Sequence, residues 1–127
     1  MSDLVVTVPK RLWQEWIAEG DLPGEPWSGA YSHFWVGSAP DRDRLLGAPD
    51  ARVYIVSHGR LRGYAPLFDV EFRCRLAPRR SCLLRRGDAV AVTIDEPIHG
   101  FRGWRYRWWD RYEELPFPDW RTAGVTS

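Results

Sequence analysis

The stretch LRGYAPLFDVEFRCRL, residues 61–76, decides the fold class, because its second half alternates between apolar and charged side chains. In an extended chain Phe68 and Val70 face one side of the strand, and Asp69 and Glu71 face the other. This two-residue period predicts a long β-strand over 61–76 with one face in the core and one in water. Pro66 predicts a bulge or bend near the start of that strand.

Shorter runs of β-branched and aromatic residues predict further strands on both sides of this one. They cover residues 4–8, 31–36, 52–57, 89–94 and 101–109. In the last of them, Trp104, Trp108 and Tyr112 also fit one face of a helix, and we prefer the strand because aromatic and arginine residues alternate there.

Residues 9–19 predict one amphipathic helix. Pro9 suits a first helical turn, and Gly20 suits a C-terminal stop. The apolar residues between them form a single stripe, Leu12, Trp13, Trp16 and Ile17. One helix, several short strands and frequent turn signals predict an α+β, mostly β fold, a small antiparallel pseudo-barrel with the helix packed at its end.

The length of 127 residues predicts one domain, which we place over 1–120, with 121–127 as a flexible tail. The chain has 44% hydrophobic residues but no apolar stretch long enough to span a membrane, and no signal peptide is evident. The formal net charge of +1 argues against a non-specific polyanion binder. Two cysteines, Cys74 and Cys82, make no disulfide framework, so a cytoplasmic location is expected.

Two stretches rich in arginine carry the candidate binding residues. In His58–Leu67, alternation places Arg60 and Arg62 on the same side, as a fork for a phosphate or carboxylate, with Tyr64 next to it. The alternative is a hairpin turn with solvated arginines. In Gly100–Arg111, the residues Trp104, Arg105, Tyr106, Arg107 and Trp108 alternate in type.

Aromatic rings that stack on bases beside arginines that hold phosphates are typical of single-strand or flipped-base recognition. The alternative for 100–111 is a strand whose aromatic face completes the core while its arginines pair with Asp110, Glu113 and Glu114. Both interpretations stay open, because a core face and a functional face alternate along one strand.

The sequence contains few residue patterns that are typical of catalysis. No nucleophile elbow, phosphate-binding glycine loop or metal-ligand spacing is present, so we expect no metal and no cofactor. The weak candidates for acid or base groups are Lys10, Glu15, His58 and Glu96.

The order of these elements, ending in the segment LLRRGDAVAV at 83–92, resembles the PUA-like superfamily, which includes PUA, ASCH and EVE/YTH-type domains. The resemblance covers most of the chain by pattern, and the ASCH signature Gly-x-Lys-x-x-x-Glu-x-Arg is missing from it. It implies a pseudo-barrel whose cleft binds RNA or holds a modified base between aromatic walls. The residues that look like such walls are Trp27, Trp35, Tyr64 and Trp104.

The sequence therefore predicts a binding module for RNA, for single-stranded or modified DNA, or for a nucleotide-like small molecule. Its aromatic cleft would carry a rim of arginines, namely Arg60, Arg62, Arg105 and Arg107. Two alternatives remain. One is a small hydrolase or nuclease acting on nucleoside-like or RNA substrates, and the other is a protein-interaction domain with weak self-association through exposed Trp108, Trp109 and Trp120.

Overall fold

The computed structural model describes residues 3–8, 10, 32–36, 50–71, 81–85, 90–120 and 122–123, with the backbone alone at 32–36, 68–71 and 81–85. Within these residues one sheet contains β1 (Leu4–Thr7), β2 (Ser32–Val36), β3 (Arg52–Ser57), β4 (Arg60–Glu71), β5 (Ser81–Arg85) and β7 (Trp104–Tyr106). A second sheet pairs β6 (Val92–Thr93) with β8 (Leu115–Pro116), and the 3-10 helix η2 (Arg111–Glu113) precedes β8. The protein is mostly β, as the alternating patterns predict.

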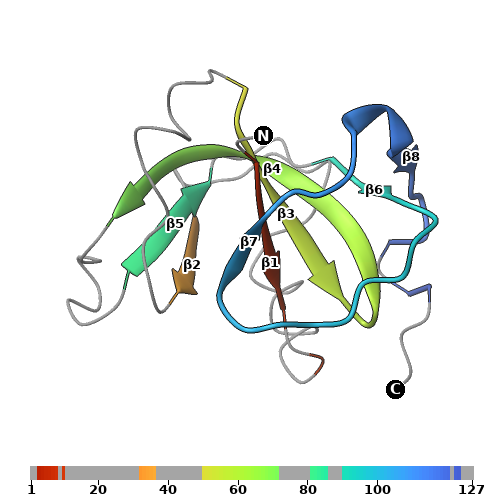
Figure 1. The fold of residues 1–127 in the computed structure, drawn as a ribbon, viewed down its shortest axis with the longest axis horizontal. Coiled ribbons are helices and arrows are strands. Elements are labelled where there is room, and N and C mark those ends of the chain that lie inside the picture. Colours follow the sequence, from red (N-terminus) through yellow and green to blue (C-terminus); the bar gives the residue numbers. More distant parts are fainter. Residues whose placement is uncertain are drawn as a thin grey trace.

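The long strand β4 joins the two halves of the main sheet, whose order is β2-β5-β4-β3-β1-β7 (Figure 1). The part of β4 up to Pro66 pairs with β3, and the part from Leu67 pairs with β5. The register shifts between Leu67 and Asp69, directly after Pro66, which confirms the irregularity expected there. Figure 1 shows β4 as a long curved arrow that runs from its hairpin with β3 across to β5.

The sheet is mixed, because β1 and β3 are parallel while its other strand pairs are antiparallel. Leu4 pairs with Val53, and Thr7 pairs with Val56. The chain between these strands must therefore return to the end of the sheet at which β1 begins. This parallel pair is the exception in a sheet that is otherwise antiparallel, and a short apolar run does not show in which direction it will pair.

The predicted strands at 4–8, 31–36 and 52–57 match β1, β2 and β3 to within one residue. The strand predicted over 89–94 is reduced to β6, and Val90 forms an isolated bridge to Tyr64. The strand predicted over 101–109 is reduced to β7, because Gly103 before it adopts a positive φ of 73°. Residues 11–19 of the predicted helix and 72–76 of the predicted long strand lie outside the described residues.

A two-residue turn joins β3 to β4. His58 and Gly59 both have positive φ, 52° and 76°, which is the geometry of the tight hairpin turn that follows the twist of two strands. Gly59 adopts this backbone without strain, whereas His58 is held there by the pairing of Ser57 with Arg60 on either side.

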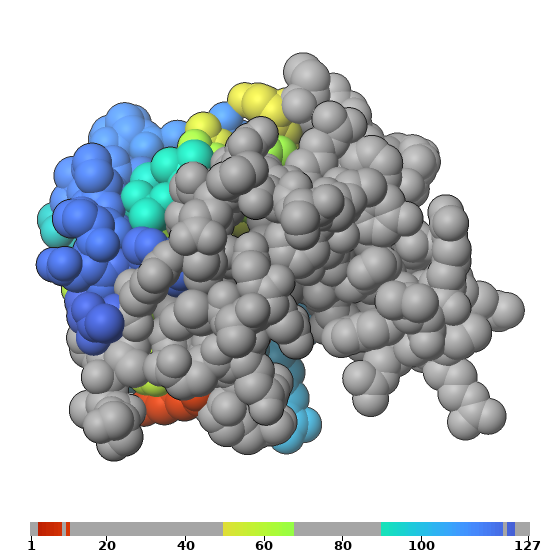
Figure 2. Space-filling model, turned by 180° about the vertical axis from the view of Figure 1, so that it is seen from behind, coloured from red at the N-terminus to blue at the C-terminus, as the bar shows by residue number. Residues whose placement is uncertain are grey.

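Apolar side chains pack on both faces of the sheet. Alternation along β1 sends Leu4 and Val6 into one cluster and Val5 into the other. The C-terminal segment, residues 107–120, contributes to both, with Phe117 and Trp120 on the first face and Trp109 on the second. In the view from behind, this segment (blue) covers one flank beside the residues around 90 (cyan) (Figure 2).

Phe117 and Trp120 thus hold the C-terminal segment against the body. Phe117 N–H also donates to the Ala91 carbonyl at 3.1 Å, next to the β6–β8 pairing. As for membranes, no helix in the described ranges is both long and apolar enough to cross one.

Candidate functional site

The structure places the predicted ligand-binding residues in three different environments. Trp27 lies outside the described residues, and Trp35 is described only as backbone of β2. Arg62 and Arg107 are buried. The side chains that are half-exposed or exposed are Arg60, Tyr64, Trp104 and Arg105.

Arg62 is an interior residue with no exposed surface. Its Nε donates to the Ser57 carbonyl at 2.9 Å, and its NH1 donates to the Trp120 carbonyl at 3.0 Å. Arg60 and Arg62 do lie on the same side of β4, as alternation predicts, because both guanidinium groups lie over the Phe117 ring. Burial, together with the charge of Arg60, lowers the pKa of Arg62 to about 10, so Arg62 stays charged at neutral pH. Of the two arginines expected to bind a phosphate or carboxylate together, Arg62 is therefore buried in the interior.

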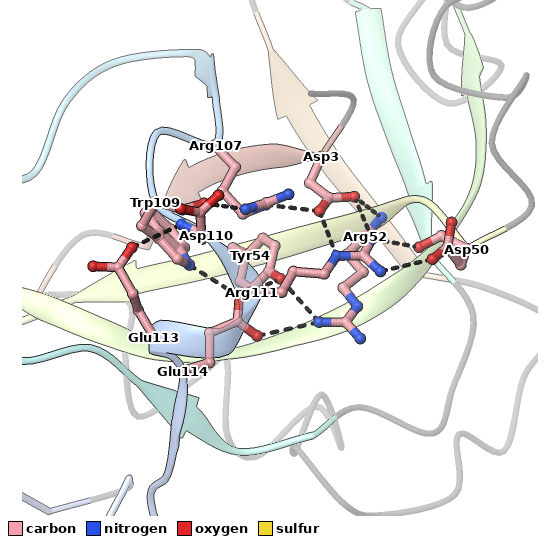
Figure 3. Close-up of polar contacts among 10 residues, drawn as sticks. All are labelled: Asp3, Asp50, Arg52, Tyr54, Arg107, Trp109, Asp110, Arg111, Glu113 and Glu114. Atoms are coloured by element: carbon pink, nitrogen blue, oxygen red, sulfur yellow. Dashed lines mark hydrogen bonds and ion pairs between the residues drawn. The ribbon is translucent and has the colours of Figure 1, made fainter.

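Arg107 is buried in an ion-pair cluster around Asp3 (Figure 3). Arg107 Nε donates to Asp3 Oδ2 at 2.8 Å, and Arg111 donates to both Asp3 oxygens at 3.0 and 3.1 Å. Arg111 also pairs with Asp50 at 2.7 Å. The two carboxylates raise the pKa of Arg111, chiefly through the Asp3 hydrogen bonds. Arg107 thus joins the first described residues of the chain to the C-terminal segment, and is not part of an exposed rim.

A second buried carboxylate, Glu114, holds the same segment to β3 (Figure 3). Tyr54 Oη donates to Glu114 Oε2 at 2.6 Å, and Trp109 Nε1 donates to the same oxygen at 2.9 Å. Arg52 NH1 donates to Glu114 Oε1 at 3.1 Å and to Tyr54 Oη at 3.0 Å. Glu114 therefore accepts hydrogen bonds from three side chains, two of them on β3.

Burial and the hydrogen bond to Glu114 raise the pKa of Tyr54 above its ordinary value of 10.0. The folded state therefore holds this proton at alkaline pH, whereas the unfolded state releases it near pH 10, so stability is lost as pH rises above 10. We expect Tyr54→Phe to flatten this loss in urea unfolding followed between pH 8 and pH 11. Arg62 acts in the opposite direction, so the wild-type protein and the variant are compared at each pH. Equal slopes for the two proteins would contradict the assignment.

Rings and guanidinium groups form a continuous series across the second face of the sheet. It begins with Arg105 over the Phe101 ring, 4.3 Å from the centroid, and ends with Arg52 over the Tyr64 ring at 3.9 Å. Between these ends, successive ring centroids lie 5.1 to 6.4 Å apart, in the order Phe101, Trp108, Trp109, Tyr54 and Tyr64. The interior rings are those of Trp109 and Tyr54.

One end of this series is open to solvent, and we call Phe101, Arg102, Arg105 and Trp108 the β7 patch. Trp108 is 41% exposed, and within the described part of the chain its indole N–H has no hydrogen-bond partner. Arg102 and Arg105 are exposed, and neither is paired with a described carboxylate. An exposed ring beside unneutralised guanidinium groups is suited to a flat, anionic ligand.

The other tryptophans whose side chains the structure describes, Trp104, Trp109 and Trp120, do not belong to this patch. Trp104 and Tyr106 alternate with Arg105 and pack against the apolar cluster on the opposite face of the sheet, with their two ring centroids 5.1 Å apart in an edge-to-face contact. Trp109 and Trp120 are buried, which corrects the expected exposed trio to Trp108 alone. Their burial follows from the core positions of the neighbouring Tyr54 and Phe117.

The catalytic candidates do not form an activated group. Glu15 lies outside the described residues, and Lys10 and Glu96 are exposed. Ser57 Oγ donates to the Val8 carbonyl at 2.8 Å, so His58 Nδ1, 3.0 Å away, donates to Ser57 and does not take its proton. Burial and the charges of Arg62 and Lys10 lower the pKa of His58. Across the described ranges, no three His, Cys, Asp or Glu side chains are grouped closely enough to hold a metal ion.

Sequence reasoning does not find Asp3 or Arg52, and it names Glu114 only as a partner for the arginines of 100–111, whereas Glu114 accepts from Arg52, Tyr54 and Trp109. Asp3, Arg52 and Glu114 belong to residue types that are usually exposed, and no local pattern marks one that will be buried. One usable signal is the position of Asp3 directly before the apolar run Leu4–Val6, because a carboxylate drawn into a core needs a cationic partner. Phe101 lies in the stretch that sequence analysis emphasises, but its ring contact with Arg105 depends on the turn at Gly103.

Comparison of the chain with protein-family models, with curated proteins and with solved structures finds no match.

Proposed function

We propose that this protein binds single-stranded nucleic acid, with one base stacked on Trp108 and a phosphate held by Arg105. The observation that carries the proposal is that the exposed Trp108 ring and Arg105 both contact the Phe101 ring. Arg105 is already held in place, since its guanidinium lies over the Phe101 ring, which in turn contacts Trp108. A stacked guanidinium keeps its N–H donors available at its edge, where a phosphate oxygen binds.

The distribution of charge favours single strands over duplexes. Arg52, Arg107 and Arg111 are neutralised by Glu114, Asp3 and Asp50. The formal net charge of the chain is only +1. Binding to a duplex relies on many phosphate contacts, whereas single-strand binding gains much of its affinity from stacking.

The finer fold expectation, a PUA-like pseudo-barrel with an N-terminal helix, is part of this proposal. The mostly β body and the β4 strand shared by both halves of the sheet support it. In that arrangement the cleft walls would include Trp27 and Trp35, whose side chains lie outside the described set. A ligand bound at the β7 patch would then contact one edge of the sheet.

Trp108→Ala is expected to lower the affinity for a labelled single-stranded RNA or DNA 10-mer about tenfold or more, because stacking of one base on an aromatic side chain contributes roughly 1–3 kcal/mol. Fluorescence anisotropy of the labelled oligomer measures this without relying on the tryptophan that is removed. Arg105→Gln is expected to weaken binding and to reduce the slope of affinity against salt by about one ion.

Tyr112→Ala is the matched control, since Tyr112 is 85% exposed and makes no described ring contact. It should bind like the wild-type protein. Equal losses for Trp108→Ala and Tyr112→Ala would show that binding is not localised at the β7 patch, and no binding by the wild-type protein to either nucleic acid would refute the proposal.

A protein-interaction surface is the second candidate, favoured by one observation. Among the described residues, three of the four exposed large hydrophobic side chains, Trp108, Tyr112 and Leu115, lie within one eight-residue segment, and the fourth is Val90. Exposed apolar groups gathered in this way are typical of contact surfaces between proteins. Light scattering over a range of concentrations tests self-association, and a mass that stays monomeric would exclude a second copy as the partner.

A further inference from the structure

Trp108 is the exposed member of a short run whose neighbours on both sides are buried and bonded. Arg107 before it pairs with Asp3, and Trp109 after it donates to Glu114. Both neighbours have less than a tenth of their surface exposed. The backbone of Trp108 is thus fixed from two directions, by two buried carboxylates that come from opposite ends of the described chain.

The Trp108 ring also packs against the buried Trp109 ring. Its centroid lies 5.1 Å from that of Trp109 in an edge-to-face contact at 87°. The orientation of Trp109 is set by its hydrogen bond to Glu114 and by its edge-to-face contact with Tyr54 at 5.1 Å. Glu114 is itself held by Arg52 and Tyr54, so the support extends to the centre of the main sheet.

From this arrangement we infer that Glu114 is the positioning residue of the β7 patch, which orients Trp109 and through it presents Trp108 ready for stacking. The inference rests on the proposed function, because it assumes that a base stacks on the exposed Trp108 ring. A ring held in its binding orientation loses little conformational entropy when a base stacks on it, and this saving appears as affinity. In the proposed role, Glu114 does not contact the ligand and acts only by orienting Trp109.

Glu114→Gln is the test, because glutamine keeps the shape of the side chain but offers one oxygen where the carboxylate offers two, and competing donors share it. We expect binding of a labelled oligo(dT) 10-mer to weaken about fivefold to tenfold, with the slope of affinity against salt unchanged because Arg102 and Arg105 are intact. Glu113→Gln is the matched control. It removes the same charge one residue earlier on an exposed side chain that bonds only the Asp110 N–H, and we expect it to bind within about twofold of the wild-type protein.

A spectroscopic measurement separates positioning from general stability. In Glu114→Gln the ¹H–¹⁵N indole signals of both Trp109 and Trp108 should shift and broaden, while backbone signals of β3 and β4 keep their dispersion. Unchanged Trp108 signals would overturn the inference whether or not the wild-type protein binds nucleic acid. Wild-type binding with full affinity retained in Glu114→Gln would overturn it as well.

If Glu114→Gln does not fold, Trp109→Phe performs the same test from the donor side. Phenylalanine keeps a buried ring against Tyr54 but removes the N–H that Glu114 accepts, and Arg52 and Tyr54 still satisfy the carboxylate. We expect the same loss of affinity and the same change in the Trp108 signal. The absence of wild-type binding, with the Trp108 signal still shifted by the variants, would refute the proposed function while leaving the positioning role supported.

Discussion

Asp3→Asn is expected to lower the free energy of unfolding by about 3–5 kcal/mol, because it leaves the buried Arg107 without the carboxylate that pairs with it. Only 3% of the Asp3 side chain is exposed, so water does not replace the lost charge. Arg111 loses its two bonds to Asp3 in the same step. Urea unfolding, followed by circular dichroism and tryptophan fluorescence together, measures the change.

Asp50→Asn is the control for this prediction. Asp50 pairs with the same Arg111, and that bond lowers the pKa of Asp50, but the carboxylate is exposed to water. Exposed ion pairs contribute little to stability, so the urea midpoint should move far less than in Asp3→Asn. Equal shifts for the two variants would show that burial does not distinguish the two carboxylates.

Arg62→Ala is expected to lower the free energy of unfolding by about 2–4 kcal/mol. The substitution leaves a cavity and removes the donors bonded to the Ser57 and Trp120 carbonyls, and relief from burying a charge offsets part of that loss. Since Arg62 has no exposed surface, nucleic-acid affinity per folded molecule should stay within about twofold of the wild-type value.

Arg62→Met separates packing from hydrogen bonding, because methionine refills most of the cavity without a donor. It should be more stable than Arg62→Ala and less stable than the wild-type protein. If either variant lost nucleic-acid binding without losing stability, the result would contradict this prediction and indicate that Arg62 contacts the ligand.

The strand content of the fold is predictable from the sequence, because alternation within a strand is a local property. Residues 68–71 show this alternation, residues 52–57 form a run of β-branched and aromatic residues, and both lie in strands. The parallel pairing of β1 with β3 is not predictable in this way, since it depends on the path of the chain between them. The glycine at 59 is predictable because a tight turn favours a residue that adopts positive φ easily. The positive φ of His58 is not predictable from its residue type, because the pairing of the two flanking strands imposes it.

The sequence predicts which stretch and which residue types form the candidate site, but not which individual residues in that stretch are exposed. The stretch 100–111 does carry exposed Arg105 and Trp108. Arg107 belongs to the same alternation, yet Asp3 draws it into the interior from far away in the sequence. Residue periodicity describes which side of a strand a residue faces, and a distant partner decides whether that side is covered.

The position of β1 between β3 and β7 also has a consequence for how the chain folds as it is made. β1 is synthesised before both of its partners, one of which begins at Arg52 and the other at Trp104. Asp3 meets Arg107 and Arg111 across more than a hundred residues. On the ribosome, β1 therefore keeps apolar side chains uncovered until β3 has emerged, and one of its edges stays unpaired until β7 follows. Because these pairings join residues far apart in the sequence, folding is expected to be slow.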